Sequence, residues 1–256
     1  MTNPSFTTLG VAEPILRSLI AANYNEPTPI QVQVIPGALS KRDILGIAQT
    51  GTGKTAAFGL PLLQRLADKR TPLGPKGARA LILAPTRELA IQIHDSLRNY
   101  GRHLSLRHAV VLGGVSQGKQ VSALRKGVDV LVATPGRLLD LIKQKHLRLD
   151  LVENFVIDEA DRMFDMGFIR DVRKIVSYLP RNRQSMLFSA TMPADVMHLV
   201  GEMLHDPLRV NVSPKEMTVA RVDQQVHFVA TQDKRMLLLQ LLCDEALKRV
   251  IVFSRT

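Results

Sequence analysis

Short apolar segments rich in β-branched residues alternate with amphipathic segments of helical period along most of the sequence. The apolar segments are continuous, which is typical of strands buried on both faces. Strands that alternate with helices predict an α/β fold, with a mostly parallel sheet and helices on both faces. The predicted strands are Ile44–Ala48, Ala80–Ala84, Ala109–Leu112, Val128–Ala133, Asn154–Ile157, Ser185–Phe188 and Leu208–Val212. The predicted helices between them include Lys54–Ala67, Arg87–Tyr100, Ser116–Lys126, Phe168–Tyr178 and Ala194–Leu204.

The alternation breaks after residue 212. Residues 213–224 are polar, contain Pro214 and show no period, which predicts a linker. After the linker the sequence predicts a strand (Val226–Ala230), a helix (Lys234–Leu247) and one more apolar run (Val250–Phe253). A segment of about thirty residues is too short for a core of its own. We therefore expect a first domain over residues 1–212 and the truncated start of a second domain over 225–256.

The composition of the chain indicates in which cellular compartment the protein is found. The chain has one cysteine, Cys243, so no internal disulfide framework is possible, and a reducing compartment is expected. No apolar run approaches the twenty residues that a membrane span needs. The first residues, MTNPSFTTLGVAEP, lack the basic and then apolar pattern of a signal peptide. These features predict a cytoplasmic protein without a membrane association.

A glycine-rich loop follows the first predicted strand and opens a helix. Its residues are Gln49, Thr50, Gly51, Thr52, Gly53, Lys54 and Thr55. Glycines let successive backbone N–H groups point at phosphate oxygens, and the helix N-terminus adds its dipole. In such loops the lysine reaches the β and γ phosphates and the Ser/Thr hydroxyl holds Mg²⁺. The general pattern begins with glycine, where this chain has Ala48. The alternative is a strand–helix turn that binds nothing.

An acidic cluster follows another predicted strand. Asn154–Ile157 leads directly into Asp158, Glu159, Ala160 and Asp161. Adjacent carboxylates at a strand end are costly unless a cation or solvent offsets their charge. Beside a phosphate loop, Asp158 suits a residue that holds Mg²⁺ through its water shell, and Glu159 suits the group that orients and deprotonates the attacking water. Asp161 is better placed to brace neighbouring motifs. The alternative is a solvated acidic helix start.

The chain carries a strong positive charge, with 34 Lys and Arg against 23 Asp and Glu, a net charge of +11. Residues 98–148 contain ten of these bases and two acids, which is +8 in one segment. A basic segment indicates a polyanionic partner, although a solvated face without a partner would look the same.

Taken together, these motifs resemble those of the DEAD-box RNA helicases, a family with two RecA-like lobes. The stretch Asp158–Ile169 resembles most the bacterial RhlE-like branch of that family. The order and spacing of the matching segments agree along the whole chain. The matching segments are Tyr24–Gln31 with the upstream Phe6, Ala48–Thr55, Pro85–Leu89, Gly113-Gly114, Thr134–Arg137, Asp158–Asp161, Ser189–Thr191 and Val250–Thr256.

The resemblance implies how the chain holds ATP. Gln31 is expected to hydrogen-bond the adenine edge, since an amide that donates and accepts at once can select adenine. Tyr24 is expected to pack on the adenine ring, with Pro29 beside it. Asn23 stands where the family usually has glycine, so we expect a slightly altered turn there. ATP and Mg²⁺ are the implied cofactors, with Lys54, Asp158 and Glu159 as catalytic residues.

The resemblance also implies RNA binding. Three loops are expected to contact RNA, and their threonines, glycines and arginines suit phosphate oxygens rather than base edges. Aromatic residues make up only 4% of the chain, which argues against a stacking platform for bases. The charge of residues 98–148 is then expected to lie along this RNA track. The expected RNA-binding residues are Pro85, Thr86, Arg87, Gly113, Gly114, Thr134, Pro135, Gly136 and Arg137; those expected to couple hydrolysis to unwinding are Asp161, Ser189, Ala190 and Thr191.

The implied partners are RNA and a second RecA-like lobe, of which this sequence holds only the opening. The second lobe would supply an arginine for the transition state, so we expect very little ATPase from this chain alone. An ATP-gated RNA clamp remains open as an alternative function, since a clamp would carry the same motifs. A monomer is expected, although the apolar tail after residue 213 offers a route to self-association.

Overall fold

The computed structural model describes residues 4–69, 73–212, 225–244 and 246–254. The chain divides into two compact units, Met1–Ser213 and Pro214–Thr256. The predicted linker 213–224 lies outside the described residues, and so do Arg255 and Thr256 at the end of the last matching segment.

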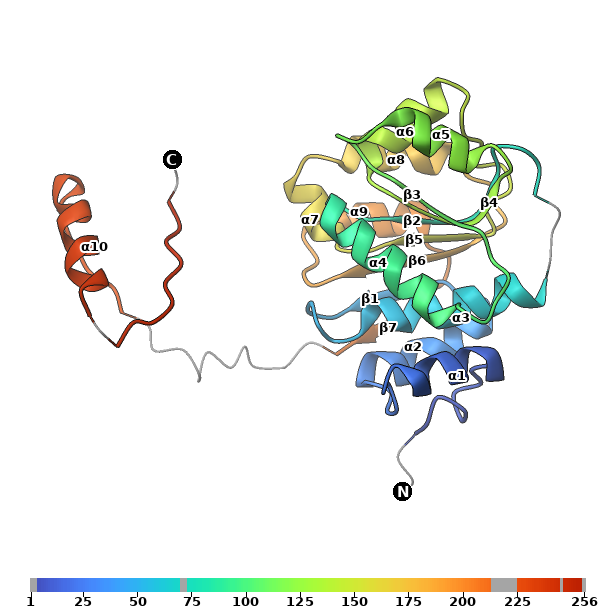
Figure 1. Cartoon of the computed structure of the whole chain (residues 1–256), viewed down its shortest axis with the longest axis horizontal. Helices are drawn as coiled ribbons and strands as arrows, with labels where there is room; N and C mark the ends of the chain where they lie inside the picture. The colour runs from blue at the N-terminus through green and yellow to red at the C-terminus, as the bar shows by residue number, and fades with distance from the viewer. Residues whose placement is uncertain (1–3, 70–72, 213–224, 245, 255–256) are drawn as a thin grey trace. The chain divides into compact units, whose positions relative to one another are not determined.

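The first unit is built on a seven-stranded sheet in which all neighbouring strands are parallel (Figure 1). The strand order is β3-β4-β2-β5-β6-β1-β7, so β1 lies between the last two strands of the unit. All seven predicted strands are present, and the predicted α/β fold is confirmed. The strands are β1 (Ile44–Ile47), β2 (Ala78–Leu83), β3 (His108–Val111), β4 (Val128–Ala133), β5 (Asn154–Ile157), β6 (Gln184–Ser189) and β7 (Leu208–Asn211).

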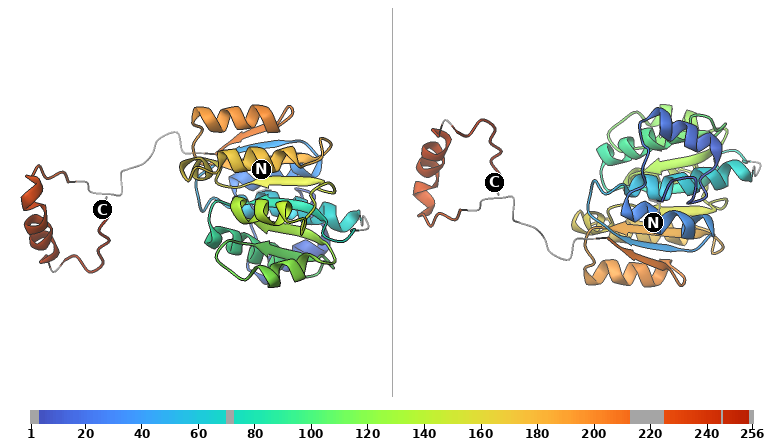
Figure 2. Two further views of the ribbon diagram at one scale, coloured as in Figure 1. Left: turned by 90° about the horizontal axis from the view of Figure 1, so that it is seen from above. Right: turned by 90° about the horizontal axis from the view of Figure 1, so that it is seen from below.

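Helices cover both faces of the sheet, and each face has its own apolar core. Side chains of the first four helices pack against one face, and those of the next five pack against the other. The view from below in Figure 2 brings the blue helices α1 and α2 to the front. The helices are α1 (Glu13–Ala21), α2 (Pro29–Leu39), α3 (Lys54–Asp68), α4 (Arg87–Tyr100), α5 (Gln117–Leu124), α6 (Pro135–Lys143), α7 (Ala160–Asp165), α8 (Ile169–Ser177) and α9 (Ala194–Met203).

A buried arginine joins several of these elements. Arg79 lies on β2 and is only 2% exposed. Its guanidinium donates to the carbonyl oxygens of Leu66 and Lys69 at the end of α3. It also pairs with Asp129 on β4, at 3.2 Å, and with Glu153 just before β5, at 3.3 Å. A buried charge is tolerated when it is paired and hydrogen-bonded in this way.

In the described part of the second unit, a 3₁₀ turn (Thr231–Asp233) leads into the short helix α10 (Lys234–Leu242), which ends before the predicted Leu247. The predicted strand Val226–Ala230 is wrong, because these residues form no ladder within the described part of the chain. A strand needs a partner for its backbone groups, and these residues have none there. Several apolar side chains of this unit are exposed, among them Phe228 at 98% and Phe253 at 92%. In the described residues, no helix is long and apolar enough to cross a bilayer.

Candidate active site

Six loops leave the carboxyl ends of six adjacent strands, where parallel α/β sheets bind their ligands. The loops expected to contact RNA follow three neighbouring strands, β3, β4 and β2. The phosphate loop and the acidic cluster, which are expected to handle ATP, lie at the ends of β1 and β5, and the motif expected to couple hydrolysis to unwinding lies at the end of β6 between them (Figure 1). The carboxyl ends of the strands therefore carry the three expected RNA loops on one side and the ATP and coupling motifs next to them.

The phosphate loop connects β1 to α3 with two glycines in left-handed conformations, Gly51 at φ +86° and Gly53 at φ +93°. Lys54 begins the helix and is buried, and its Nζ donates to the carbonyl oxygen of Ala48 at 3.0 Å. The Thr52 hydroxyl donates to the carbonyl oxygen of Gln49 at 2.8 Å. The strand, loop and helix context that the sequence pattern required is thus present, and Thr55 follows Lys54 in the first turn of α3.

Gln31 locks the phosphate loop to the start of α2. Its side chain is fully buried, and its Oε1 accepts a hydrogen bond from the backbone N–H of Thr28 at 2.9 Å. Its Nε2 donates to the carbonyl oxygen of Gly53, at 3.0 Å, and to the Tyr24 hydroxyl. A Cβ atom at Gly53 would lie 2.4 Å from this Nε2 atom. The absence of a side chain at Gly53 is therefore what lets the amide approach the loop.

Tyr24 is held on its other side by an aromatic contact. Its ring stacks on Phe6 with 5.5 Å between ring centroids and 27° between planes. Asn23, directly before it, adopts φ +53°. This is the left-handed region that glycine enters freely and asparagine tolerates better than most residues. The replacement of glycine by Asn23 is therefore compatible with the turn.

Asp158 lies at the end of β5, fully buried beside Lys54. Its Oδ1 is 3.8 Å from Lys54 Nζ and accepts a hydrogen bond from the Glu159 backbone N–H at 3.0 Å. Burial raises the pKa of Asp158 to about 6, although Lys54 opposes the shift. A buried carboxylate with this little compensation favours the arrival of a further cation.

Glu159 stands over a cavity of about 370 Å³ between the phosphate loop and α7. Its backbone has φ +52°, a strained conformation for a non-glycine residue. Its carboxylate accepts a hydrogen bond from Thr50 Oγ1 at 3.3 Å and pairs with Arg162 Nη1 at 3.3 Å. The cavity is lined by Thr50, Lys54, Glu159, Asp161, Arg162, Asp165 and Ala190.

Asp161 connects the acidic loop to the loop after β6. Its Oδ2 accepts hydrogen bonds from the backbone N–H groups of Ala190, at 3.2 Å, and Thr191, at 2.8 Å, and from the Thr191 hydroxyl at 2.9 Å. Its own N–H donates to Ser189 Oγ at 3.1 Å. Burial alone would raise the pKa of Asp161, but the hydrogen bonds from Thr191 and Ser189 hold it below its usual range. These hydrogen bonds join the acidic loop to the loop after β6.

The other three loops are tied together by two arginines. Arg87 opens α4 and lies against Gly114, where a Cβ atom would come within 2.6 Å of its Nη1 atom. Arg137, in the first turn of α6, donates from Nη1 to the carbonyl oxygen of Val115 at 3.2 Å. The loops after β2 and β4 are thus each linked to the loop after β3.

Helix starts account for the rest of these three loops. Thr86 caps α4 by accepting a hydrogen bond from the Leu89 N–H at 3.3 Å, just after the buried Pro85. Thr134 is the N-cap residue of α6, and Pro135 and Gly136 form its first turn. Proline suits the first helical position because no N–H is required there. Gly113 and Gly114 turn the chain after β3, with Gly114 at φ +70°.

The model of the DEAD/DEAH box helicase family matches residues 28–199, which include all six loops. The chain belongs to this family. The six loops described above therefore lie in a domain of the DEAD/DEAH box helicase family, and the α/β fold is RecA-like, as the resemblance implied.

Curated relatives agree with this assignment. The chain is 40% identical over 253 residues to the DEAD-box ATP-dependent RNA helicase RhpA of Helicobacter pylori strain B128, covering 99% of this chain and 50% of that protein. It is 42% identical to the DEAD-box ATP-dependent RNA helicase CshA of Streptococcus pneumoniae serotype 4 (98% and 47% covered). It is 43% identical to the ATP-dependent RNA helicase RhlB of Xanthomonas axonopodis pv. citri (100% and 46% covered). The chain thus spans about half the length of these relatives. The RhlE-like branch stays a prediction.

Solved structures also match. A DEAD box protein from the hyperthermophile Methanococcus jannaschii aligns with a TM-score of 0.76 at 34% identity, over 94% of this chain and 63% of the other. A hypothetical ATP-dependent RNA helicase from Sulfolobus tokodaii aligns with a TM-score of 0.71 at 34% identity, over 78% and 56%.

The sequence did not predict a role for Arg162, although this residue directly follows the acidic tetrapeptide. It contacts Glu159 because α7 begins at Ala160 and brings residues three apart onto one side. The six residues of α7 are too few to show a helical period. A helix expected at this position, with an acid three residues before a base, would have predicted the ion pair between Glu159 and Arg162.

The basic segment 98–148 is distributed differently from the expectation. Arg98 lies in the last turn of α4 and Arg102 just beyond it, while Arg107 directly precedes β3. Arg125 and Lys126 lie in the turn between α5 and β4. These five positions surround the amino ends of β3 and β4, whereas the six loops lie at the carboxyl ends of the strands. The expectation that the segment's charge lines the RNA track is wrong for them.

Proposed function

We propose that this chain is the ATP-binding lobe of an ATP-dependent RNA helicase that couples ATP hydrolysis to local RNA duplex unwinding or RNP remodelling. The observation that carries the proposal is the shared sheet edge, on which the phosphate loop, the acidic cluster and the coupling motif adjoin three loops expected to contact RNA phosphates. The names of the curated relatives support it. Because the chain spans about half of those relatives, the activity is proposed for the longer protein.

The residues at the phosphate loop fit ATP and Mg²⁺. Thr50, Gly51, Thr52 and Gly53 supply the loop backbone, and Gln31 and Tyr24 stand beside it for the adenine. Thr55 and Asp158 supply the hydroxyl and carboxylate oxygens that Mg²⁺ prefers. No group of three or more His, Cys, Asp or Glu in the described residues forms a metal site by itself. This suits Mg²⁺, which keeps several waters and binds through one or two carboxylates plus substrate phosphates.

The chemistry follows from which side chains surround the cavity. Lys54 places its positive charge on the β and γ phosphates of ATP, and bound Mg²⁺ adds charge neutralisation there. Glu159 orients a water molecule and accepts its proton as the water oxygen bonds to the γ phosphorus. The bond from that phosphorus to the bridging oxygen breaks, which releases ADP and phosphate.

RNA recognition is proposed to follow the phosphate backbone. Arg87 and Arg137, with the N-termini of α4 and α6, offer cationic and N–H donors but no groups arranged for base edges. We therefore expect little sequence preference, and discrimination against DNA through the 2′-hydroxyl. Asp161 is proposed to transmit the state of the acidic loop to Ser189, Ala190 and Thr191 through the hydrogen bonds described above.

The same proposal covers the organisation of the chain. Residues 1–212 form the ATP-binding domain, 213–224 a linker and 225–256 the opening of a second RecA-like lobe, in a cytoplasmic protein. The first unit is proposed to be monomeric, with any self-association arising from the exposed apolar residues of the second unit.

The decisive experiment measures ATP hydrolysis by the two-lobe protein, with and without single-stranded RNA, in the wild type and in Glu159→Gln. We expect RNA to stimulate turnover and DNA to stimulate it far less. Glu159→Gln should still bind ATP but lose about 10²–10⁴ in turnover, the usual contribution of a positioned base. Unchanged turnover in Glu159→Gln would show that another group activates the water.

Duplex displacement separates the helicase from the ATP-gated clamp. A helicase separates a short RNA duplex in the presence of ATP, and Glu159→Gln does not. A clamp retains RNA when ATP is bound but leaves the duplex paired. DNA that stimulates hydrolysis as well as RNA does would contradict both readings and favour a DNA-processing ATPase.

A further inference from the structure

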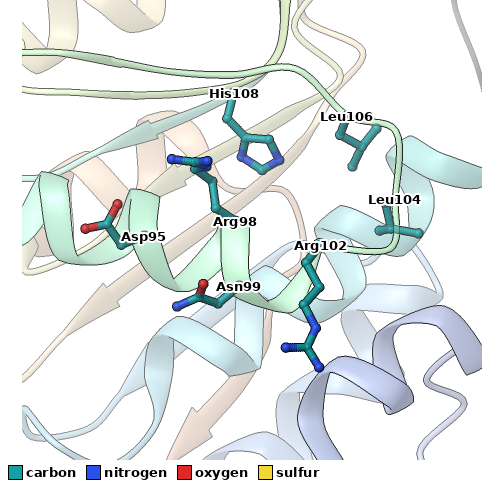
Figure 3. Close-up of a pocket in the computed structure, with 8 residues that line it drawn as sticks. Asp95, Arg98, Asn99, Arg102, Leu104, Leu106 and His108 are labelled. Carbon is teal, nitrogen blue, oxygen red and sulfur yellow. The ribbon is translucent and has the colours of Figure 1, made fainter. Parts of the chain in front are cut away.

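The amino end of the edge strand β3 carries two hollows that share His108. The first, of about 550 Å³, lies between the last turn of α4 and the segment leading into β3 (Figure 3). The second, of about 450 Å³, lies between the end of α5 and the start of β4. The bases that line them are Arg98 and Arg102 in the first, and Arg107, Arg125 and Lys126 in the second. We call these five residues the amino-end basic surface.

The cations of the first hollow are free to take an anion. Arg98 and Arg102 are exposed, the first in the last turn of α4 and the second just beyond its end. Within the described residues, neither forms an ion pair with a carboxylate. The one acid of this hollow, Asp95, contacts His94 at 3.3 Å instead. Arg102 donates to the neighbouring His103 ring at 3.3 Å.

Arg107 fixes the shape of the second hollow. It donates to the carbonyl oxygen of Lys126 at 2.7 Å, and its Nε atom is 3.9 Å from Asp129. This holds the turn that carries Arg125 and Lys126, whose side chains are exposed. The positive charge of this surface therefore comes from exposed side chains, and hydrogen bonds hold the backbone that carries them in place.

His108 adds a hydrogen-bonding group between the two hollows. Figure 3 shows its ring beside the Arg98 guanidinium. Its Nδ1 atom is buried and lacks a hydrogen-bond partner among the described residues. Burial, together with His94 and Arg98, lowers the pKa of His108 to about 4, so the ring is neutral at pH 7 and can donate one hydrogen bond.

The lining favours a nucleic acid over a protein. Protein interfaces centre on exposed aromatic, aliphatic or methionine anchors surrounded by a polar rim. None of the large exposed hydrophobic residues of the described chain lines either hollow; Leu104 and Leu106 are half-buried and pack against the core. Arginine and lysine without such anchors match a phosphodiester backbone.

We propose that the amino-end basic surface binds the phosphodiester backbone of RNA that extends beyond the six loops, as a second contact at the opposite edge of the sheet. The inference rests on the proposed function, since it takes RNA as the ligand. It accounts for the five bases that the RNA loops do not use. It predicts that long strands gain affinity from a region that contacts no ATP-binding residue.

The test measures binding of a long single-stranded RNA to the chain by fluorescence anisotropy over a salt series. The surface variant combines Arg98→Gln, Arg102→Gln and Lys126→Gln. The matched control combines Arg42→Gln, Arg170→Gln and Lys174→Gln, three exposed bases outside both hollows with the same charge change. A third variant, Arg87→Gln with Arg137→Gln, tests the loops. Thermal unfolding of every variant verifies the fold.

We expect the surface variant to lower the slope of log K against log salt by about 2, at about 0.7 for each single-strand phosphate contact, while the control keeps the wild-type slope. An unchanged slope in the surface variant, with binding weakened in the loop variant, would overturn this inference and leave the proposed function standing. No RNA binding by the wild type would overturn both. Two results together would assign the surface to an acidic polypeptide instead. In the wild type, polyglutamate would displace RNA at a lower concentration than competing RNA does. In the surface variant, polyglutamate would not displace RNA.

Discussion

Two glycines of the phosphate loop share a left-handed backbone but differ in their surroundings. A Cβ atom at Gly51 would meet nothing within 4 Å, whereas one at Gly53 would collide with Gln31 Nε2. Gly51→Ala therefore adds backbone strain alone, about 1 kcal/mol, and Gly53→Ala adds the loss of the Gln31 contacts as well. We expect Gly53→Ala to lower the free energy of unfolding by about 1–3 kcal/mol more than Gly51→Ala, measured by denaturant unfolding without nucleotide. Equal losses would show that Gln31 does not hold the loop.

Asp158 gives the stability of the native chain an unusual pH dependence. Its pKa is about 6 in the folded chain and 3.8 as a free group, so between these values the native state holds a proton that the unfolded state has lost. The contribution of Asp158 to the free energy of unfolding must then fall as the pH rises through this window, by up to about 3 kcal/mol, and stay level above it.

Asp158→Asn removes the titrating group and serves as the reference. We expect the unfolding free energy of the wild type, relative to Asp158→Asn, to decrease as the pH rises from about 4 to about 6. Parallel pH profiles for the two proteins would contradict the burial argument.

At this scale the sequence predicts residue types but not their contacts. Lys54, Asp158 and Glu159 stand out because their chemistry is visible in short local patterns that adjoin strands. The hydrogen bonds of Gln31 to Gly53 and of Asp161 to Thr191 join residues 22 and 30 positions apart. Such contacts depend on how loops from separate strands meet, which no local pattern contains.

Among the elements, Arg79 tests how far one buried charge supports the packing around it. Removing its guanidinium takes the closest cation from Asp129 and Glu153, and it leaves the carbonyl oxygens of Leu66 in α3 and of Lys69 just after it without this donor. We expect Arg79→Met to lower the free energy of unfolding by about 3–5 kcal/mol, the usual loss when a buried pair is broken. Denaturant unfolding measures the loss. Adding Asp129→Asn to Arg79→Met should recover part of it, because Asp129 then no longer carries a buried charge whose remaining ion pair is the longer one with Arg107, at 3.9 Å. No recovery would place the loss in packing rather than charge.

Strands and helices were predicted correctly where their own sequence shows a clear hydrophobic pattern. All seven strands of the sheet are apolar enough to be recognised singly, and the long helices have clear periods. The segment predicted as a strand at Val226–Ala230 is also apolar and rich in β-branched and aromatic residues, but it has no neighbouring strand among the described residues. Apolar, β-rich composition indicates that a segment can form a strand, and only the sheet beside it decides that it does.

For the whole molecule, the exposed apolar residues of the second unit should govern association. We expect the wild-type chain to form oligomers whose population grows with concentration. A variant with Leu239→Lys, Ile251→Lys and Phe253→Lys should remain monomeric, because it removes exposed apolar area that favours burial. Light scattering at several concentrations measures both.

A matched variant separates this effect from general solubility. Ile20→Lys, Ile91→Lys and Met197→Lys change three exposed apolar residues of the first unit by the same charge. This variant should associate as the wild type does. A wild type that stays monomeric at every concentration, or a control that abolishes association, would contradict the assignment to the second unit.

The position of β1 in the sheet sets an order for the folding of the newly made chain. Ile44 pairs with Met186 on one side and Leu208 on the other, so its partners are synthesised 142 and 164 residues later. A strand without neighbours is not stable by itself, and contacts this distant in sequence form slowly. The phosphate loop therefore cannot take its final shape until β6 and β7 have emerged from the ribosome. A nascent chain would gain the proposed nucleotide site only near the end of the first unit, so we expect incomplete chains not to bind ATP.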